Sequence, residues 1–172
     1  MRCLQLSAAL LAVLFVSPAA AHVSLTVKEA RVGLTYKATL VVGHGCEGAS
    51  TTTLRVQIPE GFYNAKPMPK AGWEVETVTG AYSAPFDNHG TQMNEGVREI
   101  SWTEGDLPDG HFDEFVFRGT FGPAVKEGTR FHFPVIQLCG EKEDAWTDTS
   151  GSDAAEFPAP FLEVTPAAEG HH

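Results

Sequence analysis

Short stretches in which apolar and polar residues alternate recur along the whole chain. The alternation has a period of two and is rich in β-branched and aromatic residues, which is typical of half-buried β-strands. Gly, Pro, Asn and Asp separate the stretches, and no segment keeps the 3.6-residue period of an amphipathic helix. The pattern predicts an all-β fold, an antiparallel β-sandwich of seven to nine strands. The expected strands are residues 22–29, 34–42, 50–58, 73–79, 97–102, 112–119, 130–138 and 161–164.

The first residues of the chain do not follow this pattern. Arg2 precedes an apolar run at residues 6–16, and the small residues Ala19 to Ala21 come directly after it. A charged start, an apolar run too short to span a bilayer comfortably and a small-residue site are the features of a secretory signal peptide. The sequence therefore predicts a signal peptide at residues 1–21, cleaved just before His22.

Cleavage there defines the expected organisation of the mature protein. We expect one β-sandwich domain at residues 22–165 and a flexible tail at residues 166–172, in the periplasm or outside the cell. Cys3 lies ahead of the apolar run, so it cannot be the first mature residue of a lipoprotein.

The charge balance excludes two classes of partner. The chain carries 12 Lys and Arg against 22 Asp and Glu, a formal net charge of −10, and losing Arg2 with the signal makes the mature protein more negative still. We therefore expect no binding to nucleic acid or to anionic lipid. The sequence also lacks a nucleophilic serine motif, a nucleotide-binding loop and an H-E-x-x-H helix, which leaves a hydrolase without support.

Two cysteines remain after cleavage, Cys46 in "GHGCEG" and Cys139 in "IQLCGE". In an exported protein, a pair this far apart in sequence predicts one disulfide bond. The competing interpretation is a pair of thiolates that bind a soft metal.

His22 has unusual chemistry if it is the first mature residue. Its α-amine and its imidazole Nδ1 can close a chelate ring on one metal ion, and nitrogen donors of this kind suit Cu(II). The α-amine has a pKa near 8, so a metal displaces its proton easily at neutral pH. The alternative is that His22 is merely a solvated first residue.

A two-nitrogen chelate needs further ligands. The glycine-rich turn "GHGCEG" offers His44 and Glu47, and both side chains suit Cu(II), so the residues alone do not choose between them. The weaker metal-binding candidates are His89, His111, His132, Met68 and Met93, together with His171 and His172 in the tail.

Longer motifs give the chain a resemblance to a known family. "AHVSL", "GCEGASTTTLRVQIPEGF", "AKPMPKAGWEVE", "GVREISWTEGDLPDGHFDEFVFRG" and "FPVIQLCGEKEDAW" resemble the YcnI-like family of exported copper-binding domains, from His22 to about Val164. The resemblance implies an immunoglobulin-like β-sandwich and a Cu(II) site called a monohistidine brace. It places the brace histidine at His22, the glutamate at Glu47 and a neighbouring tryptophan at Trp146, with the disulfide supporting the Glu47 loop.

The expected function follows from this resemblance. We expect a non-enzymatic protein of copper homeostasis or delivery, whose partners are the copper ion and other periplasmic copper-handling proteins. The family often carries a carboxy-terminal membrane anchor, whereas this sequence ends in "EGHH", so we expect no anchor after cleavage. The alternatives are a copper-dependent oxidative enzyme of the lytic polysaccharide monooxygenase type, with a second imidazole from His44, His89 or His111, and a metal-free interaction module.

Overall fold

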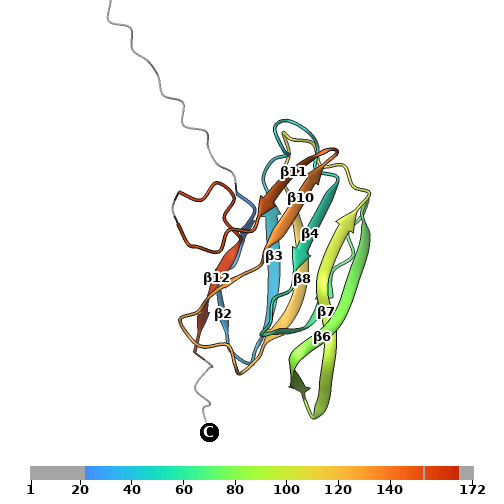
Figure 1. The fold of residues 1–172 in the computed structure, drawn as a ribbon. Helices are drawn as coiled ribbons and strands as arrows, with labels where there is room; N and C mark the ends of the chain where they lie inside the picture. Colours follow the sequence, from blue (N-terminus) through green and yellow to red (C-terminus); the bar gives the residue numbers. More distant parts are fainter. Residues whose placement is uncertain (1–21, 153, 167–172) are drawn as a thin grey trace, which may run out of the picture.

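The computed structural model describes residues 22–152 and 154–166, and Figure 1 shows its fold. The expected signal peptide at residues 1–21, the tail residues 167–172 and the candidate ligands His171 and His172 lie outside the described residues. The described part folds into strands joined by turns, and the all-β prediction is confirmed. It contains no helix long and apolar enough to cross a membrane.

Two sheets face each other and form the sandwich. One has four strands in the order β1-β3-β8-β5, and the other has five in the order β11-β10-β4-β7-β6 (Figure 1). The four-stranded sheet consists of β1 (Ser24–Leu25), β3 (Thr35–Val42), β8 (Asp113–Phe121) and β5 (Phe62–Pro67). The five-stranded sheet consists of β11 (Lys142–Trp146), β10 (Val135–Cys139), β4 (Thr53–Gln57), β7 (Thr91–Thr103) and β6 (Glu74–Asn88).

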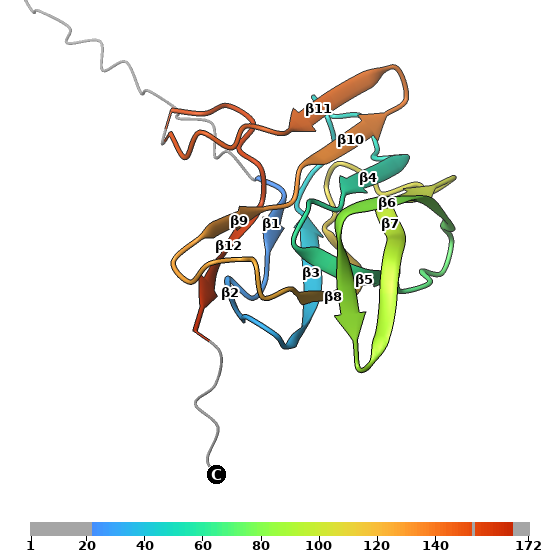
Figure 2. The ribbon, with the colours of Figure 1, turned by 60° about the horizontal axis from the view of Figure 1, so that its bottom comes forward.

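A third, smaller sheet lies at one side of the sandwich (Figure 2). Its order is β2-β12-β9, with β2 at Glu29–Arg31, β12 at Phe161–Thr165 and β9 at Arg130–His132. The β12–β2 pairing is parallel, whereas every other strand pairing in the described part is antiparallel.

The described residues form twelve strands, more than the seven to nine expected. Two expected strands are each divided: residues 22–29 contain β1 and the start of β2, and residues 130–138 contain β9 and most of β10. Pro134 lies at the second break, where it has no N–H to donate to a neighbouring strand. β5 and β11 lie in segments where the alternation predicts no strand.

Alternate residues of the facing strands fill the space between the two large sheets. Phe62 is at the centre, and its ring packs against Phe117, Phe121 and Phe133 with centroids 5.0–6.0 Å apart. A second aromatic cluster lies apart from this core, where Tyr63, Tyr82 and Phe86 pack between β5 and β6. The long β6–β7 hairpin is thus held against β5 by an aromatic cluster that is separate from the main core.

Candidate functional site

Two histidines meet one tryptophan at the edge of the sandwich. His22 lies two residues before β1, His44 follows β3, and Trp146 is the last residue of β11. The His22 ring lies 5.7 Å from the Trp146 ring between centroids, and the His44 ring lies 6.2 Å from it, both in edge-on geometry. Trp146 is 3% exposed. The fold therefore brings together residues from three distant segments of the sequence, including two of the expected site residues.

Gln137 holds the indole in place. This β10 side chain is completely buried, and its Oε1 accepts a hydrogen bond of 2.9 Å from Trp146 Nε1. Its Nε2 donates to the carbonyl of His44 and to Thr51 Oγ1, both at 2.7 Å. One side chain thus fixes the orientation of Trp146 and the backbone at His44. A buried amide with all these partners is costly to disturb, because each orphaned group would lose its hydrogen bond without gaining water.

Sequence reasoning missed Gln137, although its signal is present in the alternation. Val135, Gln137 and Cys139 are the buried positions of β10, with Ile136 and Leu138 more exposed between them. A polar residue at a buried position of a strand needs partners, because burying an unpaired amide is unfavourable. That position therefore pointed to a polar network, although not to its members.

The predicted disulfide is present between Cys46 and Cys139. The bond joins the turn after β3 to the end of β10 across a sequence separation of 93 residues, and both cysteines are buried. The competing interpretation, a pair of metal-binding thiolates, is therefore wrong for these cysteines. A disulfide of this kind is typical of an oxidising environment.

Glu47 lies in the tight turn that follows Cys46. The Cys46 and Ala49 backbones hydrogen-bond to each other at 3.2 and 3.0 Å, and the two residues between them have positive φ angles, 47° at Glu47 and 84° at Gly48. This is the geometry of a two-residue hairpin turn, in which glycine suits the second position. The Glu47 side chain is 82% exposed and pairs with Lys142 Nζ at 3.0 Å. Its carboxylate is therefore held over the β10–β11 hairpin and remains open to solvent.

Asp144 of β11 links these groups electrostatically. Burial raises the pKa of its carboxyl group, the electrostatic influence of the neighbouring His44 lowers that pKa, and the negative charge of Glu47 raises it. The carboxylates of Glu47 and Asp144 and the His44 imidazole therefore lie within electrostatic reach of one another. Negative charge at this edge favours a cation.

The described residues do not form a closed metal cage from side chains. Within residues 22–152 and 154–166, no group of three or more His, Cys, Asp or Glu side chains is placed to hold a metal ion. Metal binding at this edge would thus depend on the main-chain nitrogen of His22 as well as on its imidazole. The His44 ring is also suited to binding: its Nδ1 is hydrogen-bonded to the Gly45 carbonyl, and in a neutral imidazole that donates from Nδ1 the lone pair lies on Nε2.

The family model described as Domain of unknown function (DUF1775) matches residues 22–164. The chain belongs to the DUF1775 family. The chain is similar to an uncharacterized protein from Nocardia farcinica, whose crystal structure reveals an immunoglobulin-like fold, with 23% sequence identity and a TM-score of 0.62. That match covers 84% of this chain and 98% of the other, and it shows that this DUF1775 domain has the immunoglobulin-like fold. The comparison with curated proteins finds no match.

A hollow of about 310 Å³ opens beside His22 in this DUF1775 domain. Arg130, His132 and Asp148 contribute to its lining. Burial lowers the pKa of His132, and the neighbouring charge of Arg130 lowers it further. His132 thus shares a hollow with His22, a proximity that sequence reasoning did not predict.

The remaining weaker candidates are distributed over other parts of the DUF1775 domain. His89 occupies the β6–β7 turn, at the end of the molecule away from β11 (Figure 1). Met93 packs against the aromatic cluster of Tyr63, Tyr82 and Phe86. His111 lies in the loop before β8, and Met68 follows β5 with half of its surface exposed.

Proposed function

We propose that this DUF1775 domain is an exported protein that binds Cu(II) and takes part in copper homeostasis or delivery. The observation that carries the proposal is the contact of His22 and His44 with the buried indole of Trp146. The proposal includes cleavage of a signal peptide before His22, which would free its α-amine. The amine and imidazole of one residue would then provide two nitrogen donors, which Cu(II) favours.

The surroundings of His22 fit this donor set. Trp146 provides a fixed apolar wall beside the imidazole, and an indole N–H engaged with Gln137 cannot turn toward a cation. Such a wall keeps solvent from one side of a bound ion. Glu47 would contribute a carboxylate from its turn, which the disulfide at Cys46 anchors. The net charge of −10 adds a general attraction for cations.

The main test is a Cu(II) titration of the protein that begins at His22 and lacks His171 and His172, followed by electron paramagnetic resonance. We expect one Cu(II) ion with nitrogen and oxygen ligands. A matched protein that keeps Ala21 has an amide in place of the amine, and we expect its affinity to fall about 100-fold, or about 2.8 kcal/mol. Equal affinity of the two proteins would contradict the proposal.

A second experiment tests the role assigned to Glu47. Glu47→Gln removes the negative charge and should weaken Cu(II) binding while leaving the unfolding midpoint nearly unchanged, because exposed ion pairs contribute little to stability. Glu143→Gln is the matched control, since Glu143 is an exposed carboxylate on the neighbouring strand. If the two variants bind Cu(II) equally well, Glu47 is not a ligand.

Tryptophan fluorescence tests the position of the ion. Cu(II) bound at His22 should quench Trp146 in proportion to occupancy, so the quenching should be largely lost in Trp146→Phe and kept in Trp102→Phe. Quenching that persists in Trp146→Phe would place the ion elsewhere.

The position of His44 against Trp146 favours a second candidate function, that of a copper-dependent oxidative enzyme. That class binds copper with two imidazoles, and His44 provides a second imidazole against the same indole. His44→Ala separates the two functions. A loss of copper affinity comparable to that caused by blocking the amine would support the enzyme, whereas a small change would support binding and delivery through His22 and Glu47.

A further inference from the structure

A row of three positive charges crosses the outer surface of the four-stranded sheet. Arg118 of β8 lies directly opposite Lys37 of β3 on one side and Lys66 of β5 on the other. All three side chains are exposed. Because neighbouring strands are about 4.8 Å apart, the row spans about 10 Å. We call these three residues the cationic row.

The cationic row is unexpected in this molecule. Like charges directly opposite each other on a sheet are destabilising, and the chain as a whole has a net charge of −10. The described residues form five ion pairs, and the cations in these pairs are Arg55, Lys70, Arg98, Arg130 and Lys142. No member of the cationic row has a carboxylate partner in the described part of the chain. Its positive charges therefore remain available to an external anion.

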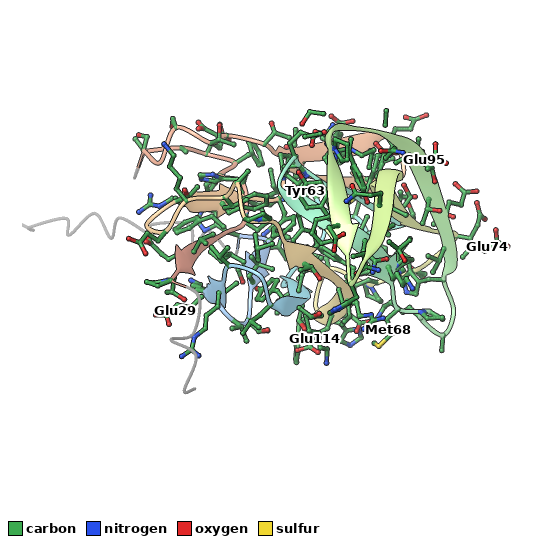
Figure 3. The ribbon with its side chains drawn as sticks, turned by 90° about the horizontal axis from the view of Figure 1, so that it is seen from below. Glu29, Tyr63, Met68, Glu74, Glu95 and Glu114 are labelled. Atoms are coloured by element: carbon green, nitrogen blue, oxygen red, sulfur yellow. A yellow bond between two sulfur atoms is a disulfide. The ribbon has the colours of Figure 1, made fainter. Side chains whose placement is uncertain are left out.

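The cationic row borders a hollow of about 350 Å³ with a mainly apolar lining. The apolar surface comes from Pro67 at the end of β5, from Met68 and Pro69 directly after it, and from Val116 of β8. The Met68 N–H donates to the Val116 carbonyl at 2.8 Å, which fixes this segment against the sheet. Met68 is 50% exposed and projects from the side of the molecule seen at the bottom of Figure 3. The hollow thus combines an exposed apolar surface with three cations.

We propose that this surface binds a small organic anion that has an apolar body. Its carboxylate, phosphate or sulfonate group would pair with the cationic row, with Arg118 at the centre because a guanidinium can form two parallel hydrogen bonds to such a group. The apolar body would lie against Met68 and the prolines. Glu114, labelled near Met68 in Figure 3, lies on β8 two residues before Val116 and therefore on the same face of the strand. Its negative charge marks the end of the positive surface.

The size of the hollow favours a small molecule over a macromolecule. Small-molecule sites have volumes of about 300 to 1,000 Å³ and combine apolar walls with a few polar groups. An anionic membrane is a poor alternative, because a protein with this net charge is repelled by such a surface. The proposal concerns a surface on the four-stranded sheet and holds whether or not His22 binds copper.

The test uses the fluorescent probe 8-anilinonaphthalene-1-sulfonate, which carries one sulfonate on an aromatic body. The protein should bind it in a single site that weakens as salt is added. Arg118→Gln should lower the affinity at least tenfold, whereas Lys126→Gln is the matched control because Lys126 is exposed in the loop after β8. Amide chemical shifts should change in β3, β5 and β8. Equal affinity of the two variants, or shifts confined to other strands, would overturn the proposal.

Competition experiments identify the type of ligand. Octanoate should displace the probe, and inorganic phosphate at the same concentration should not, because it lacks an apolar body. Displacement by phosphate as effective as that by octanoate would overturn the role of the hollow. Displacement by hexaglutamate or by phosphatidylglycerol vesicles but not by octanoate would assign the surface to an acidic protein or a membrane, and would overturn the small-molecule proposal.

Discussion

Trp102 and Trp146 are both buried, and each indole N–H donates a hydrogen bond, yet their surroundings differ. Trp102 of β7 packs against Phe115 at 5.5 Å and donates to the backbone carbonyl of Met68. Trp146 packs against two imidazoles as well as Phe157, and it donates to the side chain of Gln137. The first arrangement combines aromatic packing with a single hydrogen bond to the backbone. The second orients an indole through a buried polar network, which is a more demanding way to fill the same kind of space.

The covalent support of the two regions differs as well. The disulfide between Cys46 and Cys139 ties the Trp146 region together, whereas Trp102 is held by strand pairing and packing. The region where His22, His44 and Trp146 meet is therefore held more rigidly, by a covalent bond and a buried hydrogen-bond network.

Removing the disulfide should have the largest effect on stability. We expect Cys46→Ala with Cys139→Ala to lower the free energy of unfolding by about 4 kcal/mol, because the bond closes a long loop in the unfolded chain. Urea unfolding at equilibrium measures this loss, with the reduced wild-type protein as a control. In the native baseline, Trp146 should become more accessible to acrylamide than Trp102. A loss below about 1 kcal/mol would show that the region does not depend on the bond.

Breaking the polar network without touching the disulfide should have the next largest effect. We expect Gln137→Met to cost about 2 to 4 kcal/mol, because it leaves Trp146 Nε1 and the His44 carbonyl buried without their partner. Ile100→Met is the control in the Trp102 region, since Ile100 is equally buried and a swap of similar volume costs less than about 1.5 kcal/mol. Equal losses in urea unfolding would show that the network serves packing alone.

The fold was predictable from the sequence because each long strand carries its own period-two pattern. The expected strand at residues 34–42 corresponds closely to β3 at Thr35–Val42, and the expected strand at residues 112–119 to β8 at Asp113–Phe121. β1 and β9 were predicted only as parts of the longer expected strands at residues 22–29 and 130–138, because strands of two or three residues are too short to show a period of their own. No strand was predicted at β11, because three charged residues in "KEDAW" conceal its alternation.

The candidate site was predictable only in part. The disulfide followed from the count of cysteines, since two remain after the expected cleavage. The contact of His44 with Trp146 depends on how β3 and β11 are placed in different sheets, and no local pattern records that placement. Sequence reasoning also placed His22 and Trp146 together only through a family resemblance, not through spacing.

The turn at Glu47 offers a smaller change that separates stability from function. Asparagine tolerates a positive φ better than glutamate, and Asn-Gly is the preferred pair in this type of turn. We therefore expect Glu47→Asn to raise the free energy of unfolding by about 0.5 kcal/mol, despite the loss of the exposed pair with Lys142. Lys142→Gln removes that pair together with the exposed hydrogen bond from Nζ to the Glu47 carbonyl, and it should change stability by less than about 0.5 kcal/mol. Thermal unfolding measures both, and a destabilised Glu47→Asn would mean that the carboxylate has a structural role.

The smallest effect concerns pH and the hollow beside His22. Burial, followed by the charge of Arg130, lowers the pKa of His132 below its ordinary 6.5, while a backbone hydrogen bond and Asp148 act in the opposite direction. The unfolded chain therefore takes up a proton at His132 before the folded protein does as the pH falls. Stability should decrease as the pH falls through 6.5, and the decrease should end below the lower pKa of the folded protein.

His132→Gln should remove this part of the pH dependence, and His111→Gln, in an exposed loop, is the control for losing an imidazole. Urea unfolding between pH 5 and pH 8 would show a shallower slope for the first variant than for the wild type. An unchanged slope would mean that Asp148 and the backbone hydrogen bond fully offset burial. In that case the hollow beside His22 would accommodate a protonated imidazole without loss of stability. The Trp146 region would then differ from the Trp102 region in its hydrogen bonds and its disulfide, but not in its response to acid.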